Sequence, residues 1–151
     1  MSKKYYKCIN NAIEWAKCHL NSTEYMFRCL GFLEDAIEQS NDIVILRVDS
    51  AKESANLYES YQHTGIPPKG AFVFYDCYGQ VNGEYRNWGH VGLSINNGDV
   101  IHSWDRVRID NYLEVENLAS APGVEKPKYI GWVPLEHIIV GIQKNMYKRM
   151  D

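Results

Sequence analysis

The stretch Gly89-His90-Val91-Gly92-Leu93-Ser94-Ile95-Asn96-Asn97-Gly98-Asp99-Val100-Ile101-His102 decides how this chain folds. It predicts a β-hairpin, because two apolar runs flank an Asn-Asn-Gly turn. Each expected strand carries one histidine. Alternate residues of a strand share a face, so the register of the hairpin determines whether His90 and His102 lie on the same side of the sheet.

Two registers are compatible with this turn. A two-residue turn on Asn-Gly pairs Leu93 with His102 and puts the two histidines on opposite faces. A three-residue loop at 96–98, with Gly98 in a left-handed conformation, instead pairs Gly92 with His102. The histidines then become diagonal neighbours on one face, with backbones about 7–8 Å apart. Because glycine adopts a positive φ without steric cost, we predict the three-residue loop.

The composition is that of an ordinary globular protein. The chain has 151 residues, of which 45% are hydrophobic and 23% charged, and this predicts one domain over 1–151 with a core of its own. A net charge of −3 gives no electrostatic reason to bind nucleic acid or an anionic membrane. No apolar run approaches the roughly 20 residues of a membrane span, so we expect no integral membrane segment.

The N-terminal sequence and the cysteines bear on location and cofactors. The basic start is not followed by the apolar stretch of a secretory signal, so we expect a cytoplasmic protein. Its four cysteines (Cys8, Cys18, Cys29 and Cys77) lack the spacing of a zinc site. We therefore expect free thiols, no metal and no cofactor.

Helical patterns precede strand patterns along the chain. Apolar residues at helical spacing predict helices over about 5–20, through 29–37, and through 51–61. The start of the second helix is open, at Ser22 or nearer Arg28. Expected strands follow at 71–76, 89–95, 99–104, 106–109 and 129–133, and the run 43–48 is either a strand or a buried extended segment. Residues 110–128 read as a loop or short helix, and 135–143 as a last apolar element. Helices followed by an antiparallel meander indicate an α+β fold.

Cys29 lies at the head of the second helical pattern. A thiol and a nearby histidine are sufficient for acyl transfer through a covalent thioester. A helix N-terminus and a neighbouring imidazolium each lower the pKa of a thiol, so we expect a lowered pKa at Cys29 if the helix begins near Arg28. The alternative interpretation of a lone cysteine is a buried core residue.

Five short segments occur in order along roughly residues 25–135. They are Cys29-Leu30-Gly31-Phe32-Leu33, Pro67-Pro68-Lys69-Gly70-Ala71-Phe72-Val73-Phe74, Gly89-His90-Val91-Gly92-Leu93, Val100-Ile101-His102-Ser103 and Tyr129-Ile130-Gly131-Trp132. Together they resemble the NlpC family of papain-like bacterial cell-wall peptidases and the related CHAP-type amidases. Family members usually have Asp-Cys-Ser-Gly around the nucleophile, where this chain has Arg28-Cys29-Leu30-Gly31. The resemblance implies a papain-like (NlpC-type) fold, with N-terminal helices packed on a C-terminal antiparallel meander.

The resemblance also implies catalytic roles. Cys29 corresponds to the nucleophile of a cysteine peptidase or amidase, His90 to its general base, and His102 to the residue that orients the base. Asp105 lies close to His102 in the sequence and is an alternative orienting residue.

Further residues of the site follow from the chemistry of acyl transfer. The backbone N–H of Cys29 is the natural first donor to an oxyanion, and a hydroxyl of Tyr25 or Thr23 is a candidate second donor. Tyr25, Trp88 and Trp104 are the expected substrate contacts, although core packing explains the two tryptophans equally well.

Three functions remain open. The resemblance implies a thiol hydrolase of peptidoglycan stem peptides or their fragments. The same site also suits an intracellular amidase or acyltransferase acting on a small-molecule, peptide or lipid substrate. A non-catalytic binding domain on the same fold is the third possibility, because a fold alone does not establish a substrate.

Overall fold

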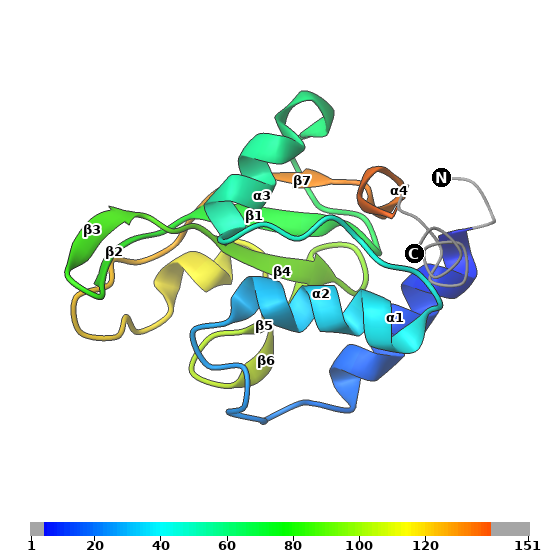
Figure 1. Ribbon diagram of the computed structural model, residues 1–151, viewed down its shortest axis with the longest axis horizontal. Coiled ribbons are helices and arrows are strands. Elements are labelled where there is room, and N and C mark those ends of the chain that lie inside the picture. Colours follow the sequence, from blue (N-terminus) through cyan, green and yellow to red (C-terminus); the bar gives the residue numbers. More distant parts are fainter. Residues whose placement is uncertain (1–4, 140–151) are drawn as a thin grey trace, which may run out of the picture.

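The computed structural model describes residues 5–139 (Figure 1). This part of the chain contains four α-helices: α1 (Tyr6–Lys17), α2 (Cys29–Ser40), α3 (Ala51–Leu57) and α4 (Leu135–Ile138). Its strands are β1 (Phe72–Asp76), β2 (Tyr78–Val81), β3 (Glu84–Asn87), β4 (His90–Ser94), β5 (Asp99–Ser103), β6 (Val107–Asn111) and β7 (Lys128–Val133). Short 3₁₀ helices lie at Glu59–Tyr61 and Glu114–Asn117.

Five of the strands form an antiparallel sheet in the order β6-β5-β4-β1-β7, and β2 and β3 form a separate hairpin that projects from it (Figure 1). The expected α+β class is confirmed. We expected no integral membrane segment. Within residues 5–139, no helix is long and apolar enough to cross a bilayer.

The sheet separates two apolar clusters. On β1, Phe72 and Phe74 are buried in the larger cluster, which includes side chains of α1, α2 and α3. Val73 and Tyr75 are buried in a smaller cluster on the opposite face. Burying a large apolar side chain contributes about 1.5–3 kcal/mol, so both faces of β1 contribute to stability. Helix α2 contacts β4 and β5, which brings its N-terminus to the end of the sheet where β4 begins (Figure 1).

Helix α2 begins at Cys29, so the later of the two predicted starts is confirmed. The chain enters the helix through Phe27, which has a left-handed backbone with φ 64°. This conformation costs an L-residue roughly 1–2 kcal/mol. The turn makes Cys29 the first helical residue, in the position predicted for the nucleophile.

The β4–β5 connection has the predicted three-residue form. Leu93 pairs with Ile101, and Gly98 has φ 107°. Continuing this register puts Gly92 opposite His102. A Cβ on Gly92 would lie only 3.0 Å from the Cβ of His102. Because glycine has no Cβ, this position stays open and the side chains of the two histidines can meet there.

Two segments differ from the expectations. The segment 43–48, expected as a strand or a buried extended segment, forms no strand beyond an isolated bridge residue at Ile43, and Leu46 and Arg47 within it are exposed. Side chains of α2 hold it instead: the N–H of Ile45 donates to Glu38 at 3.0 Å and Arg47 binds carboxylates of the helix. The β2–β3 hairpin was not expected, although its Asn82-Gly83 turn has the positive φ angles of the commonest two-residue hairpin. Of the element expected at 135–143, residues 140–143 lie outside the described range.

We predict that Gly92→Ala destabilises the protein by about 1–3 kcal/mol, the usual cost of overpacking a buried site. The new Cβ would lie only 2.2 Å from a methyl carbon of Val100. Gly31→Ala is the matched control, since its Cβ meets nothing closer than 3.8 Å and alanine favours a helix by about 1 kcal/mol. Urea denaturation of both variants checks the prediction, and equal effects of the two substitutions would contradict it.

Candidate active site

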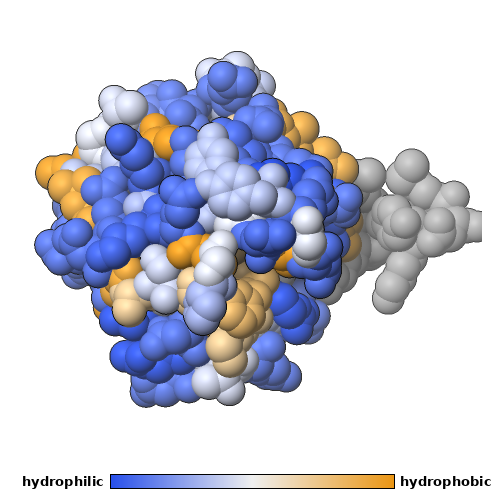
Figure 2. All heavy atoms as spheres, turned by 90° about the vertical axis from the view of Figure 1, so that its left-hand side faces the viewer, coloured by the Kyte–Doolittle hydropathy of each residue, from blue (hydrophilic) through white to orange (hydrophobic). Residues whose placement is uncertain are grey.

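A cavity of about 880 Å³ opens beside the N-terminus of α2. Cys29 and His90 both line it, together with Trp88 and Trp104. Its volume falls in the range of small-molecule sites. The beginning of α2 and the β2–β3 hairpin lie at the left of Figure 1, on the side that faces the viewer in Figure 2, where hydrophobic residues gather near the centre of a largely hydrophilic surface.

One wall of the cavity is built outside the five-stranded sheet. It comprises β2 and the segment 119–124, which join through an isolated bridge between Gly79 and Val124. The N–H of Gln80 donates to the carbonyl of Gly123 at 2.9 Å, and Tyr85 on β3 donates its hydroxyl to Glu125. The β2–β3 hairpin and the loop therefore form one unit, which we call the outer wall.

The thiol of Cys29 is held among backbone N–H groups. Those of Cys29 itself, Leu30 and Val91 interact with the sulfur and favour the thiolate, whereas burial of the side chain raises its pKa. Burial has the larger effect, so the thiol pKa lies above its usual value. The expectation of a lowered pKa is therefore wrong for the free protein.

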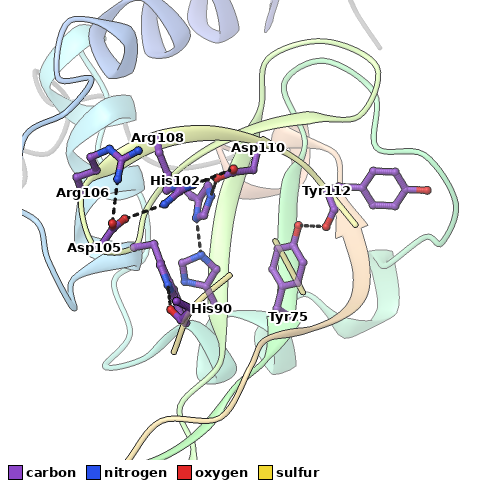
Figure 3. Close-up of polar contacts among 10 residues, drawn as sticks. Tyr75, His90, His102, Asp105, Arg106, Arg108, Asp110 and Tyr112 are labelled. Carbon is purple, nitrogen blue, oxygen red and sulfur yellow. Dashed lines mark hydrogen bonds and ion pairs between the residues drawn. The ribbon is translucent and has the colours of Figure 1, made fainter. Parts of the chain in front are cut away.

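A hydrogen-bonded chain leads from β6 to the cavity (Figure 3). His90 Nε2 lies 2.8 Å from His102 Nδ1, and His102 Nε2 lies 2.8 Å from a carboxylate oxygen of Asp110. The two histidines thus meet on one face of the sheet, as the predicted register requires.

The carboxylate determines which ring nitrogens carry protons. The pKa of Asp110 is lowered by its bonds to His102 and Arg108 although burial opposes them, so it is ionised at neutral pH and only accepts hydrogen bonds. His102 must then donate from Nε2 and accept at Nδ1, and His90 must donate to it from Nε2. The lone pair of neutral His90 is therefore on Nδ1, where it can accept a proton.

Asp110 is itself held by Arg108. The guanidinium donates through Nε to one carboxylate oxygen at 2.8 Å and through a terminal nitrogen to the other at 3.3 Å. Sequence reasoning missed Asp110, because the strand was expected to end at 109. The alternation of Arg108 and Asp110, on the face that also carries the paired His102, was the signal that identifies it.

Asp105, the alternative candidate for orienting His90, is bonded to arginines instead. Its carboxylate pairs with Arg106 at 2.9 Å and Arg108 at 3.1 Å, whereas His102 and not Asp105 contacts His90.

Both histidines are buried, with 3% of His90 and none of His102 exposed. Burial lowers the pKa of each imidazole below its usual value, and for His90 the neighbouring His102 lowers it further. The charge of Asp110 acts in the opposite direction and does not offset this effect. At neutral pH, Cys29 and His90 are therefore a neutral thiol and a neutral imidazole.

The expected substrate contacts lie in two places. Trp104 lines the cavity with its ring centre 5.0 Å from that of His90, and Trp88 lines it with Arg86 stacked on its indole. Tyr25 packs in the core against Phe32, and its hydroxyl donates to Asp35 at 2.7 Å. Neither Tyr25 nor the exposed Thr23 lines the cavity, so the structure brings neither hydroxyl to the position of a second oxyanion donor.

All four cysteines are free thiols. Within residues 5–139, no group of three or more His, Cys, Asp or Glu side chains is arranged to hold a metal ion. No model of a known protein family matches the chain, and no curated protein matches it.

The buried histidines predict an acid-sensitive fold. Below about pH 6.5 the unfolded chain binds protons at both positions while the folded site stays neutral, so the free energy of unfolding falls as pH falls until the lowered pKa values are reached. Each histidine contributes at most about 1.4 kcal/mol per pH unit, and His90, whose pKa is lowered further, contributes over the wider pH range. Urea denaturation between pH 4.5 and 7.5 measures it.

The histidine contribution can be isolated with two variants. His90→Gln should have a shallower slope than the wild type, while Cys29→Ala, which keeps both histidines, should retain the full slope. Equal slopes for all three proteins would show that His90 is not held neutral by the fold.

Proposed function

We propose that this protein is a thiol-dependent hydrolase or acyltransferase that forms a thioester on Cys29. The observation that carries the proposal is the chain from Asp110 through His102 to His90, which leaves a proton acceptor on an imidazole that lines the same cavity as the thiol. A core cysteine or a simple binding pocket has no need of a partly buried carboxylate that fixes a histidine tautomer.

In the first half of the reaction, the sulfur of Cys29 attacks the carbonyl carbon of the substrate while its proton moves to Nδ1 of His90. The backbone N–H of Cys29 is a donor to the oxyanion. When the tetrahedral intermediate collapses, the bond from carbon to the leaving nitrogen or oxygen breaks, and His90 returns the proton to the leaving group.

In the second half, water or another nucleophile attacks the thioester. His90 removes a proton from it and gives the proton back to the sulfur. His102 is a positioning residue in both halves of the reaction. It holds the His90 ring by a hydrogen bond and links it to the negative charge of Asp110, which stabilises the protonated form of His90.

The fold supports the same proposal. A cysteine at the first position of a helix that packs on a histidine-bearing strand is the arrangement that the resemblance to NlpC-type peptidases implies. We therefore extend the α+β description to a papain-like fold. The resemblance makes amide bonds of peptidoglycan stem peptides the first polar substrates to test.

We predict that Cys29→Ala abolishes hydrolysis and that Cys18→Ala, at an exposed position, does not. The wild type incubated with an activated ester should gain one acyl group on Cys29, located by mass spectrometry of the peptides. Because the thiol is neutral, its alkylation by iodoacetamide should accelerate only above about pH 8.5. Hydrolysis that survives in Cys29→Ala would refute the mechanism.

A substitution of Asp110 tests its orienting role separately. We predict that Asp110→Asn lowers kcat/KM by about 10²–10⁴-fold, because the tautomer of His102 is no longer fixed. It should also move the acid limb of the pH profile to lower pH, since the lost negative charge raises the pKa of both histidines in the wild type.

Asp105→Asn is the matched control, because its carboxylate pairs with arginines. It should change the rate and the acid limb much less than Asp110→Asn does, because Asp105 raises the pKa of His102 by its charge alone and makes no hydrogen bond to it. A larger loss of kcat/KM in Asp105→Asn than in Asp110→Asn would show that Asp105, and not Asp110, is the orienting carboxylate.

A further inference from the structure

The lining of the cavity beside Cys29 is mainly apolar. Apolar side chains reach it from the start of α2, from the segment that precedes α3, from the segment that follows β3, and from the outer wall. Representative members are Leu30, Val48, Trp88, Trp104, Pro122 and Val124. A lining drawn from so many segments surrounds a bound group on several sides.

The charged residues of the lining are paired or exposed. Glu34 lies 3.3 Å from Arg47, which it shares with Asp35 and Glu38, and burial raises the pKa of Glu34 to about 7. Asp105 is paired with arginines on β6 and the turn before it. The other two charged side chains of the lining, Arg28 and Asp49, are exposed to solvent. A free carboxylate of a stem peptide therefore meets no buried cation in this lining, and Glu34, the buried carboxyl that a free amine would meet, is already bonded to Arg47.

Large apolar side chains also stand at the cavity while exposed to solvent. Phe27 is 75% exposed, and Met26 and Val81 are exposed beside it in the lining. Phe27 is held in this position by its left-handed backbone, which is rare for a bulky residue. Strained backbone of this kind concentrates at binding sites, and exposed apolar groups beside a cavity mark a surface that an apolar ligand covers.

We propose that this cavity receives the acyl portion of the substrate and that this portion is a long aliphatic chain. The inference rests on the proposed thioester chemistry and specifies its substrate class: an amide or ester of a fatty acid. The fatty-acyl carbonyl carbon forms its bond to the sulfur of Cys29, the amine or alcohol leaves with the proton from His90, and water then releases the fatty acid.

A peptide or sugar in the same space is disfavoured for a physical reason. Its many N–H, C=O and hydroxyl groups would exchange water for a mainly apolar lining in which Gln80 and Ser120 are among the few polar residues. Each polar group left without a partner is disfavoured, whereas burying a methylene is favourable. An aliphatic chain has no such groups. Each methylene buried in the cavity is expected to raise kcat/KM by about threefold to fourfold until the chain fills it.

The test is a series of p-nitrophenyl esters with acetyl, butyryl, octanoyl and dodecanoyl groups, used below their critical micelle concentrations, beside a peptidoglycan stem peptide. The rate of Cys29→Ala is subtracted. We expect kcat/KM to rise from acetyl to octanoyl by at least two orders of magnitude. Rates that are flat or fall with chain length, or cleavage of the stem peptide in preference to octanoyl ester, would overturn the proposal and leave the thioester mechanism intact.

A binding measurement separates the two proposals. Fluorescence titration of Cys29→Ala with a dansyl-labelled undecanoic acid reports on the cavity alone. Binding without any hydrolysis by the wild type would refute the thioester mechanism while supporting the apolar cavity, and the absence of binding would refute the cavity assignment. Phosphatidylcholine vesicles in parallel distinguish a membrane lipid from a soluble acyl donor, and hydrolysis of either supports the fatty-acyl class.

Two variants locate the chain. Phe27→Gly fits the left-handed backbone without strain, and we expect it to lower kcat/KM for octanoyl ester several-fold more than for acetyl ester. Ile66→Ala is the control, because Ile66 is 64% exposed but does not line the cavity. Ala121→Phe, which adds bulk to the outer wall, should shift the preference toward shorter chains. If Phe27→Gly and Ala121→Phe both change octanoyl and acetyl hydrolysis in equal proportion, as the control does, the chain does not lie in this cavity.

Discussion

The three-residue connection between β4 and β5 is the constraint on which the candidate site depends. It sets a register in which His90 and His102 share one face of the sheet, with Gly92 leaving room between them. A shift by one residue would turn one imidazole to the opposite face and break the chain to Asp110. The proton acceptor beside the cavity is therefore a consequence of a single turn. The carboxylate of Asp110 then determines which nitrogen accepts.

Local features of the sequence predicted the parts of the site that depend on local geometry. The Asn-Asn-Gly turn was sufficient to predict the histidine pairing, whereas the helical pattern left the start of α2 open between Ser22 and Arg28. Asp110 was missed because its role arises from pairing between β5 and β6 and because the strand was expected to end at 109. The pKa of Cys29 was predicted in the wrong direction for a similar reason. Helix position is visible in the sequence, whereas the depth of burial depends on packing of distant segments.

A neutral thiol and a neutral imidazole define the resting character of such a site. A permanent thiolate attacks electrophiles and oxidants indiscriminately, because the thiolate is the reactive species. In the proposed mechanism, the nucleophile is generated only when the proton moves to His90 during attack on a positioned carbonyl. Burial would thus limit the general reactivity of the thiol. Below about pH 6.5 burial also lowers the stability of the fold, because the two histidines stay unprotonated in the folded state.

The outer wall has a consequence for how proteins of this architecture diverge. Its hairpin and loop are tied to each other by backbone hydrogen bonds and by the contact between Tyr85 and Glu125, and they contribute no strand to the five-stranded sheet. Insertions or deletions in this unit can reshape the cavity while the cysteine, the histidines and their carboxylate keep their places. If the proposed thioester chemistry holds, substrate choice and catalytic chemistry reside in separate parts of the chain, which mutation can alter independently.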